Sequence, residues 1–139
     1  MAGSTTTLSG VPPPANPSCP ARVLATMDGT ARVGQLFFVG VPMSTFNQQA
    51  IQAMVDSHAG GVVLYGNSQA GVAGIRRLTD QLRAKAGAKT PGVGLYIAAD
   101  QEGGEIQELA GPGFDAIPPA DQQGKIDPGV LQRQARRWA

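Results

Sequence analysis

Three short apolar segments, separated by stretches with helical periodicity, constrain the fold of this chain more than any other feature. They begin at Leu36, Val62 and Leu95, and each is bounded by glycine or proline. Short, continuously apolar segments of this kind are typical of strands in a parallel sheet that is covered on both faces. Parallel neighbours need a crossover of a dozen or more residues, which is usually a helix. The sequence therefore predicts an α/β fold, with right-handed strand–helix–strand units.

The stretches between the predicted strands have the pattern of amphipathic helices. The expected buried positions are Ile51, Met54 and Val55 in the first helix, and Ile75, Leu78 and Leu82 in a second helix over about residues 70–85. Gly60 and Gly61 are expected to end the first helix. A short helix is also expected over residues 21–27, residues 31–33 are expected to lead into the first strand, and a last helix is expected from Val130 after an irregular loop.

The segment LYIAADQEGG, at residues 95–104, joins an apolar strand to two carboxylates and a pair of glycines. In α/β barrels the functional residues lie at the carboxyl ends of the strands, which is where Asp100 and Glu102 fall. Alternation along an extended chain places both side chains on one side. Gly103 and Gly104 permit backbone conformations and close ligand approach that other side chains would block. These four residues form a candidate substrate-binding site.

Four segments occur in a characteristic order: GQLFFVG at 34–40, GGVVLY at 60–65, ADQEGGEIQEL at 99–109 and GPGFDAIP at 111–118. Together they resemble the amino-terminal part of family 3 glycoside hydrolases, in particular the β-N-acetylhexosaminidases, over about residues 22–139. The resemblance implies a TIM-type (β/α)8 barrel. A complete barrel needs roughly 250 residues. This chain, at 139 residues, would hold about three of its strand–helix units.

The resemblance also implies a function for a longer parent protein. That protein would be a retaining, exo-acting β-N-acetylhexosaminidase that hydrolyses terminal N-acetylglucosamine from cell-wall or related glycans, without a metal or an organic cofactor. Asp100 would accept hydrogen bonds from hydroxyl groups of the terminal sugar. The family's nucleophilic aspartate and acid/base group would lie beyond residue 139. We therefore assign no catalytic residue here and expect the chain alone to be inactive.

Other roles are open for the same residues. Asp100 could cap a helical turn after the glycines, and Glu102 could orient the loop by accepting hydrogen bonds from backbone N–H groups. Tyr65 and Phe114 could stack on a sugar or pack in the core. The family commonly carries arginines where Glu105 and Glu108 stand, so the usual ion pairs of this loop are not expected here.

Two other functions compete with the glycosidase. The first is a non-catalytic carbohydrate-binding or structural remnant of the same barrel, without the hydrolytic residues. The second is a phosphate-binding α/β barrel with glycine-rich loops. It is the weaker of the two, because carboxylates at Asp100 and Glu102 would repel phosphate.

Composition limits the partners. The formal net charge is +1, so the basic footprint of a nucleic-acid-binding protein is missing, and an uncharged sugar fits this balance. The single Cys19 cannot form a disulfide within this sequence, and the single His58 cannot form a two-histidine zinc motif. No segment approaches the ~20 apolar residues of a membrane span.

The two ends of the chain differ in composition. Residues 1–20 are rich in Pro, Ser and Thr, and we expect a disordered tail there, followed by the folded domain over residues 21–139. Such a tail often precedes a secreted domain, which favours an extracellular or cell-envelope location over the cytoplasm. Arg133, Arg136 and Arg137 are expected on a solvated helix face.

Overall fold

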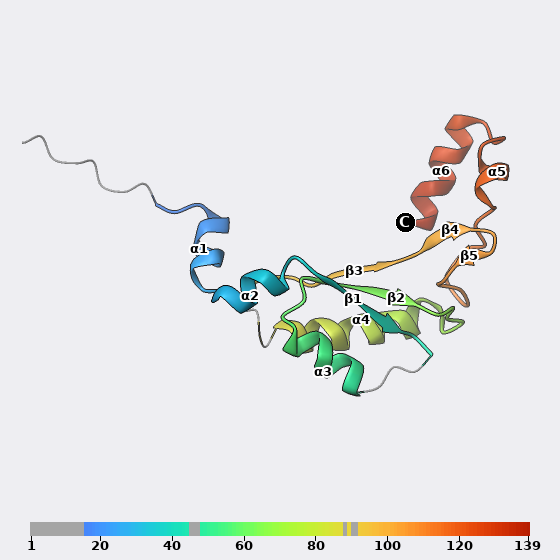
Figure 1. Cartoon of the computed structure of the whole chain (residues 1–139). Coiled ribbons are helices and arrows are strands. Elements are labelled where there is room, and N and C mark those ends of the chain that lie inside the picture. The colour runs from blue at the N-terminus through green and yellow to red at the C-terminus, as the bar shows by residue number, and fades with distance from the viewer. Residues whose placement is uncertain (1–15, 45–47, 88, 90–91) are drawn as a thin grey trace, which may run out of the picture.

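The structure is a computed structural model that describes residues 16–44, 48–87, 89 and 92–139. Most of the expected disordered tail lies outside these residues. A parallel sheet of three strands organises the described part, in the order β1 (Phe38–Pro42), β2 (Gly61–Tyr65) and β3 (Tyr96–Ala99) (Figure 1). The register aligns Phe38 with Gly61 and Gly61 with Tyr96. The predicted α/β class with parallel strands is confirmed.

Two short helices precede the sheet, α1 (Cys19–Ala25) and α2 (Gly29–Gly34). The expectation that residues 31–33 lead directly into the first strand is wrong, because they belong to α2. Asp28 caps this helix by accepting a hydrogen bond from the Ala31 N–H at 2.8 Å. The turn that ends α2 delays the first strand to Phe38 and leaves Leu36 80% exposed.

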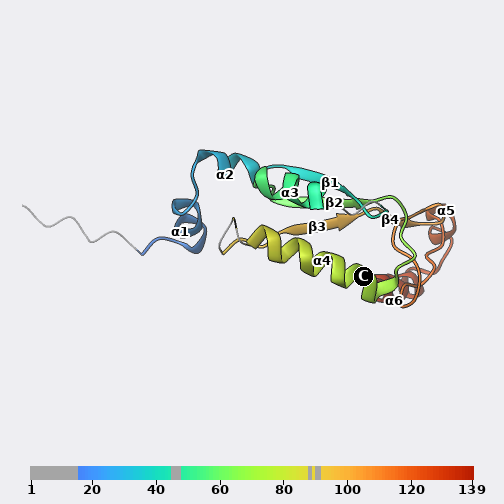
Figure 2. The same ribbon diagram turned by 90° about the horizontal axis from the view of Figure 1, so that it is seen from below.

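Helices α3 (Gln48–Asp56) and α4 (Gly71–Gly87) cover one face of the sheet (Figure 2). The predicted inward positions of both helices are confirmed, with Leu78 only partly buried. The core between helices and sheet consists of Val41, Ile51, Met54, Val55, Ala59, Val62, Leu64, Leu82 and Ala86. Strand residues enter it at alternate positions, as the two-residue period of a strand requires.

The end of α3 differs from expectation. The residue in the left-handed conformation that ends the helix is His58, with φ of 52°. We had expected the paired glycines to end the helix. Gly60 and Gly61 are needed for a different reason, which is close packing. A Cβ on Gly60 would lie 2.2 Å from the Gln35 carbonyl oxygen, and one on Gly61 would lie 2.4 Å from the Phe38 ring.

The chain beyond β3 lies past the carboxyl ends of the strands (Figure 1). It forms an antiparallel hairpin of β4 (Gln101–Gly103) and β5 (Ile106–Gln107), then α5 (Ala120–Gln123) and α6 (Pro128–Trp138). The expected loop thus contains a short helix. The last helix starts before Val130, because Asp127 caps it by accepting the Val130 N–H at 3.0 Å. None of the described helices has the length and apolar character needed to cross a bilayer.

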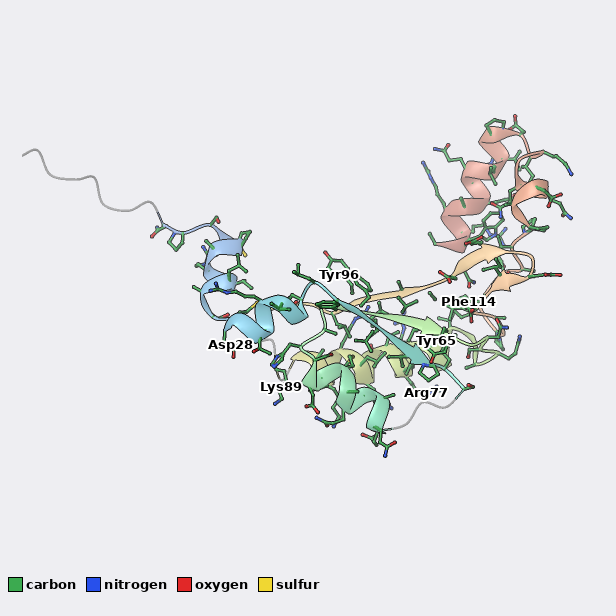
Figure 3. All side chains as sticks on the ribbon, viewed as in Figure 1. Asp28, Tyr65, Arg77, Lys89, Tyr96 and Phe114 are labelled. Atoms are coloured by element: carbon green, nitrogen blue, oxygen red, sulfur yellow. The ribbon has the colours of Figure 1, made fainter. Side chains whose placement is uncertain are left out.

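The face of the sheet opposite α3 and α4 carries exposed aromatic side chains. Phe38 is 52% exposed, Tyr96 73% and Tyr65 49%. The Phe38 and Tyr96 rings stack with centroids 6.3 Å apart. Figure 3 shows Tyr96 on the side of the sheet away from the two helices. Strand β3 ends the three-strand order, so its outer edge has no neighbouring strand in the described part of the chain.

Candidate functional site

Asp100 follows the last residue of β3 directly, at the carboxyl end of the parallel sheet. Tyr96, Ala98, Asp100 and Glu102 are all exposed, while the residues between them are half-buried. The two carboxylates therefore follow one alternating pattern, as predicted. The backbone carbonyl of Asp100 accepts the Glu108 N–H at 3.1 Å, and this bond joins the strand end to the returning hairpin.

The alternative role for Asp100, a cap on a helical turn, is wrong. The residues after it form β4 and β5 and not a helix. Within the part of the chain that the structure describes, the Asp100 carboxylate forms no hydrogen bond or ion pair. It is an exposed acceptor at a strand end, and such a group is available to a ligand.

The loop-orienting role considered for Glu102 belongs to two glutamines instead. Gln101 donates to the Leu109 carbonyl and accepts the Leu109 N–H, both at 2.9 Å. Gln107 donates to the Asp115 carbonyl and accepts the Ile117 N–H, also at 2.9 Å. Sequence reasoning missed both side chains, although an amide can donate and accept at once and so suits this task. The Glu102 carboxylate forms no hydrogen bond with any described residue.

Gly103 and Gly104 have φ of +97° and +62°, so glycine suits both positions. A Cβ on Gly103 would lie 2.3 Å from the Pro118 carbonyl oxygen, and one on Gly104 would lie 2.7 Å from the Pro119 Cβ. The close neighbours of these glycines are thus residues of the same chain, which pack the hairpin against the segment before α5. This packing does not test whether either glycine also contacts a ligand, so that contact stays a prediction.

The expected rim residues lie at two places. Tyr65 ends β2 with its side chain exposed, and a Cβ on Gly40 would lie 3.1 Å from its ring. Within the described residues Tyr65 therefore packs against β1 with its ring partly exposed, and both of its expected roles stay open. Phe114 is half-buried in the loops beyond β2 (Figure 3), where it lines a hollow of about 150 Å³ with Val72 and Trp138. His58 lies at the opposite end of the sheet, just before β2, and is not part of this site.

A hollow of about 300 Å³ lies beside Glu102. Gln101, Ile117, Gln123, Ala135, Trp138 and Ala139 line the rest of it. Another hollow, of about 280 Å³, is also lined by Trp138, together with Asp115, Gln134 and Arg137. The Arg137 guanidinium donates to the Asp115 carboxylate at 2.8 Å. The expected solvated positions of Arg133, Arg136 and Arg137 are confirmed, because all three are exposed. Sequence reasoning gave Trp138 no role, since only the fold brings α6 to the hairpin.

A parallel sheet with helices on one face and free carboxylates at the carboxyl end of a strand defines an α/β protein with a candidate ligand site at its strand ends. No protein-family model and no curated protein matches this chain. Among the described residues, no group of three or more His, Cys, Asp or Glu side chains could hold a metal ion.

The chain is similar to solved structures, of which two are described here. One is a β-N-acetylhexosaminidase from Beutenbergia cavernae DSM 12333, with a TM-score of 0.76 and 45% identity over 82% of this chain and 34% of its own. The other is a glycoside hydrolase family 3 β-N-acetylglucosaminidase from Paenibacillus sp. str. FPU-7, with a TM-score of 0.66 and 26% identity over 79% of this chain and 20% of its own. The predicted resemblance to family 3 β-N-acetylhexosaminidases is confirmed. The chain spans about a third or less of the length of these proteins.

Proposed function

We propose that this chain is the amino-terminal part of a retaining exo-β-N-acetylhexosaminidase that releases terminal N-acetylglucosamine from cell-wall or related glycans. The observation that carries the proposal is the position of Asp100, an exposed carboxylate at the end of β3, in a chain similar to solved β-N-acetylhexosaminidases. The nucleophile and the acid/base group are assigned to polypeptide beyond residue 139.

The chemistry of the strand end supports sugar binding. A carboxylate can accept hydrogen bonds from two hydroxyl groups at once, and charge-assisted hydrogen bonds are stronger than neutral ones. Asp100 and Glu102 have no partners within the described chain, so neither must break an existing bond to receive a hydroxyl group. Gly103 and Gly104 hold the hairpin in the conformation that places Glu102 beside its hollow.

The sheet supports the barrel part of the proposal. In a TIM barrel the helices lie outside and apolar strand side chains fill the interior. The exposed Phe38 and Tyr96 lie on the face without helices, and the outer edge of β3 is open. Further strand–helix units would pair with that edge and cover these aromatic rings. We assign residues 21–139 to the amino-terminal part of the barrel and residues 1–20 to a tail, whose last two residues begin α1.

The non-catalytic remnant is the second candidate. It is supported by the exposed carboxylates of Asp100 and Glu102, which could bind a sugar without hydrolytic partners. A glycosidase needs two groups about 5 Å apart in a retaining mechanism. Among the described residues, Asp100 and Glu102 are the carboxylates that directly follow β3, and we assign both to binding.

Hydrolysis by the parent protein separates the two candidates. The complete reading frame that contains this sequence should release nitrophenol from 4-nitrophenyl N-acetyl-β-glucosaminide, with retention of the anomeric configuration seen by NMR. The isolated 139-residue chain should release none. Binding of N-acetylglucosamine by the parent without hydrolysis would favour the remnant, and release of an inverted product would contradict the retaining mechanism.

A further inference from the structure

We propose that Glu108 is a positioning residue for the Asp100 carboxylate, because it connects the end of β3 to the loop after β2. The inference rests on the proposed function, in which Asp100 binds the sugar, and adds a residue that acts through Asp100. Its starting observation is that the N–H, the carbonyl and the carboxylate of Glu108 each form a hydrogen bond across this junction. A residue held at three points transmits a displacement of the loop to the strand end.

Asp100 lies where the parallel sheet ends and the hairpin begins. The residue before it, Ala99, is the last residue of β3 and pairs with Leu64 of β2. The Asp100 carbonyl accepts the Glu108 N–H at 3.1 Å. The backbone of Asp100 is therefore held by the sheet on one side and by Glu108 on the other, while its carboxylate has no partner in the described part of the chain. The direction of this carboxylate thus depends on where Glu108 holds the backbone.

The other two bonds of Glu108 reach the loop that follows β2. Its carbonyl accepts the Ser68 N–H at 2.7 Å, and its carboxylate accepts the Asn67 N–H at 2.6 Å. Asn67 has a φ of 42°, a left-handed conformation that is uncommon for residues other than glycine. A charged acceptor forms a stronger hydrogen bond than a neutral one, so the carboxylate stabilises this conformation. Glu108 thereby fixes the loop relative to the end of β3.

The side-chain bond is the part of this connection that a substitution removes. In Glu108→Ala the Asn67 N–H loses its acceptor, and the loop can shift together with the backbone that it shares with Glu108. Misplacement of a binding group by about 1 Å is enough to weaken its interaction strongly. Asp100 should then meet the sugar hydroxyl groups in a poorer geometry. Glu105 is a matched control, because it lies in the same hairpin, is exposed and forms no hydrogen bond with a described residue.

A double-mutant cycle tests the inference in the protein expressed from the complete reading frame. The measured quantity is the affinity for N-acetylglucosamine by saturation-transfer NMR. Glu108→Ala should weaken it about fivefold, and Glu108→Gln, which keeps an oxygen acceptor for the Asn67 N–H, should restore it to within about twofold. Glu105→Ala should leave it unchanged. In the Asp100→Asn background, which weakens sugar binding by itself, Glu108→Ala should have no further effect.

The Asp100→Asn background separates positioning from a general effect on the fold. A general loss of stability would lower the affinity equally in both backgrounds, and that result would overturn the inference. Unchanged affinity in Glu108→Ala, or no binding of N-acetylglucosamine by the protein, would overturn it as well. Circular dichroism checks that each variant is folded. Hydrolysis of the chromogenic substrate is measured separately, so the expected coupling without hydrolysis would support the inference and contradict only the proposed enzyme.

Discussion

The carboxylate of Glu108 accepts a hydrogen bond from the backbone N–H of Asn67 at 2.6 Å, across a sequence separation of 41 residues. The Ser68 N–H donates to the Glu108 carbonyl at 2.7 Å, and the Ala110 N–H donates to the Ser68 carbonyl at 2.8 Å. These bonds join the loop after β2 to the hairpin after β3. An acidic residue at a position where the family commonly has arginine thus has a structural role in this chain.

Removal of the Glu108 carboxylate should loosen the loop after β2. In Glu108→Ala the Asn67 N–H loses its acceptor, so its hydrogen exchange should accelerate at least tenfold in amide-resolved NMR. Glu108→Arg, the family's usual residue type, should behave in the same way. Glu105→Ala is the control, because Glu105 is exposed and forms none of these bonds. Equal exchange rates in all variants would show that the hydrogen bond does not hold the loop.

Gln107 should be important for stability despite its position in a two-residue strand. Its side chain bonds the backbone of Leu109, Asp115 and Ile117. Gln107→Ala would remove the partners of the Asp115 carbonyl and the Ile117 N–H, whereas the Leu109 carbonyl would keep Gln101. We expect the free energy of unfolding of the parent protein to fall by about 1–3 kcal/mol in urea titrations. Gln132→Ala, on the exposed side of α6, should change it by less than about 0.5 kcal/mol. Similar losses at both positions would contradict this role of Gln107.

Adding a methyl group at Gly103 should lower the stability of the fold more than adding one at Gly29, the first residue of α2. Gly103→Ala combines a φ of +97° with a Cβ 2.3 Å from the Pro118 carbonyl oxygen, and we expect a loss of about 3 kcal/mol. Gly29→Ala, with no atom within 4 Å of the added Cβ, should be neutral or slightly stabilising. Thermal melts of the two variants test this contrast. Equal melting temperatures would mean that the hairpin can shift away from Pro118.

Asp100→Ala should strongly reduce hydrolysis by the parent protein without affecting its fold. Its carboxylate has no partner in the described structure, so the variant should keep the far-UV circular dichroism of the parent protein. The value of kcat/KM for a chromogenic N-acetylglucosaminide should fall at least a hundredfold, or about 2.7 kcal/mol. Asp80→Ala, in an exposed contact with Arg83 on α4, should leave kcat/KM unchanged. Unchanged kinetics in Asp100→Ala would remove this residue from the site.

The uncovered face of the sheet should make the 139-residue chain prone to association. Exposed aromatic side chains and an open strand edge both favour contacts between copies. We expect binding of the dye ANS, a broad thermal transition and light scattering that rises with protein concentration. Phe38→Ser with Tyr96→Ser should reduce dye binding. A sharp cooperative melt without dye binding would contradict this expectation.

Local patterns predicted the elements that depend on local physics. The buried stripes of α3 and α4 follow from the helical period, and the three parallel strands follow from short apolar segments at crossover spacing. The predicted helix boundaries are less accurate where a capping residue sets the start or end of the helix. Asp28 formed a helix before β1, Asp127 started α6 early, and His58 ended α3 in place of the paired glycines.

The sequence by itself determined the parallel α/β class, the core positions and the placement of Asp100 at a strand end, because these depend on periodicities within one segment of chain. Tertiary structure alone decided that Gln101 and Gln107 fasten the hairpin, that Glu108 bonds Asn67, and that Trp138 faces the hollow beside Glu102. Such partners are set by which segments meet in space, and side-chain hydrogen bonds and hollows leave no periodic pattern in the sequence.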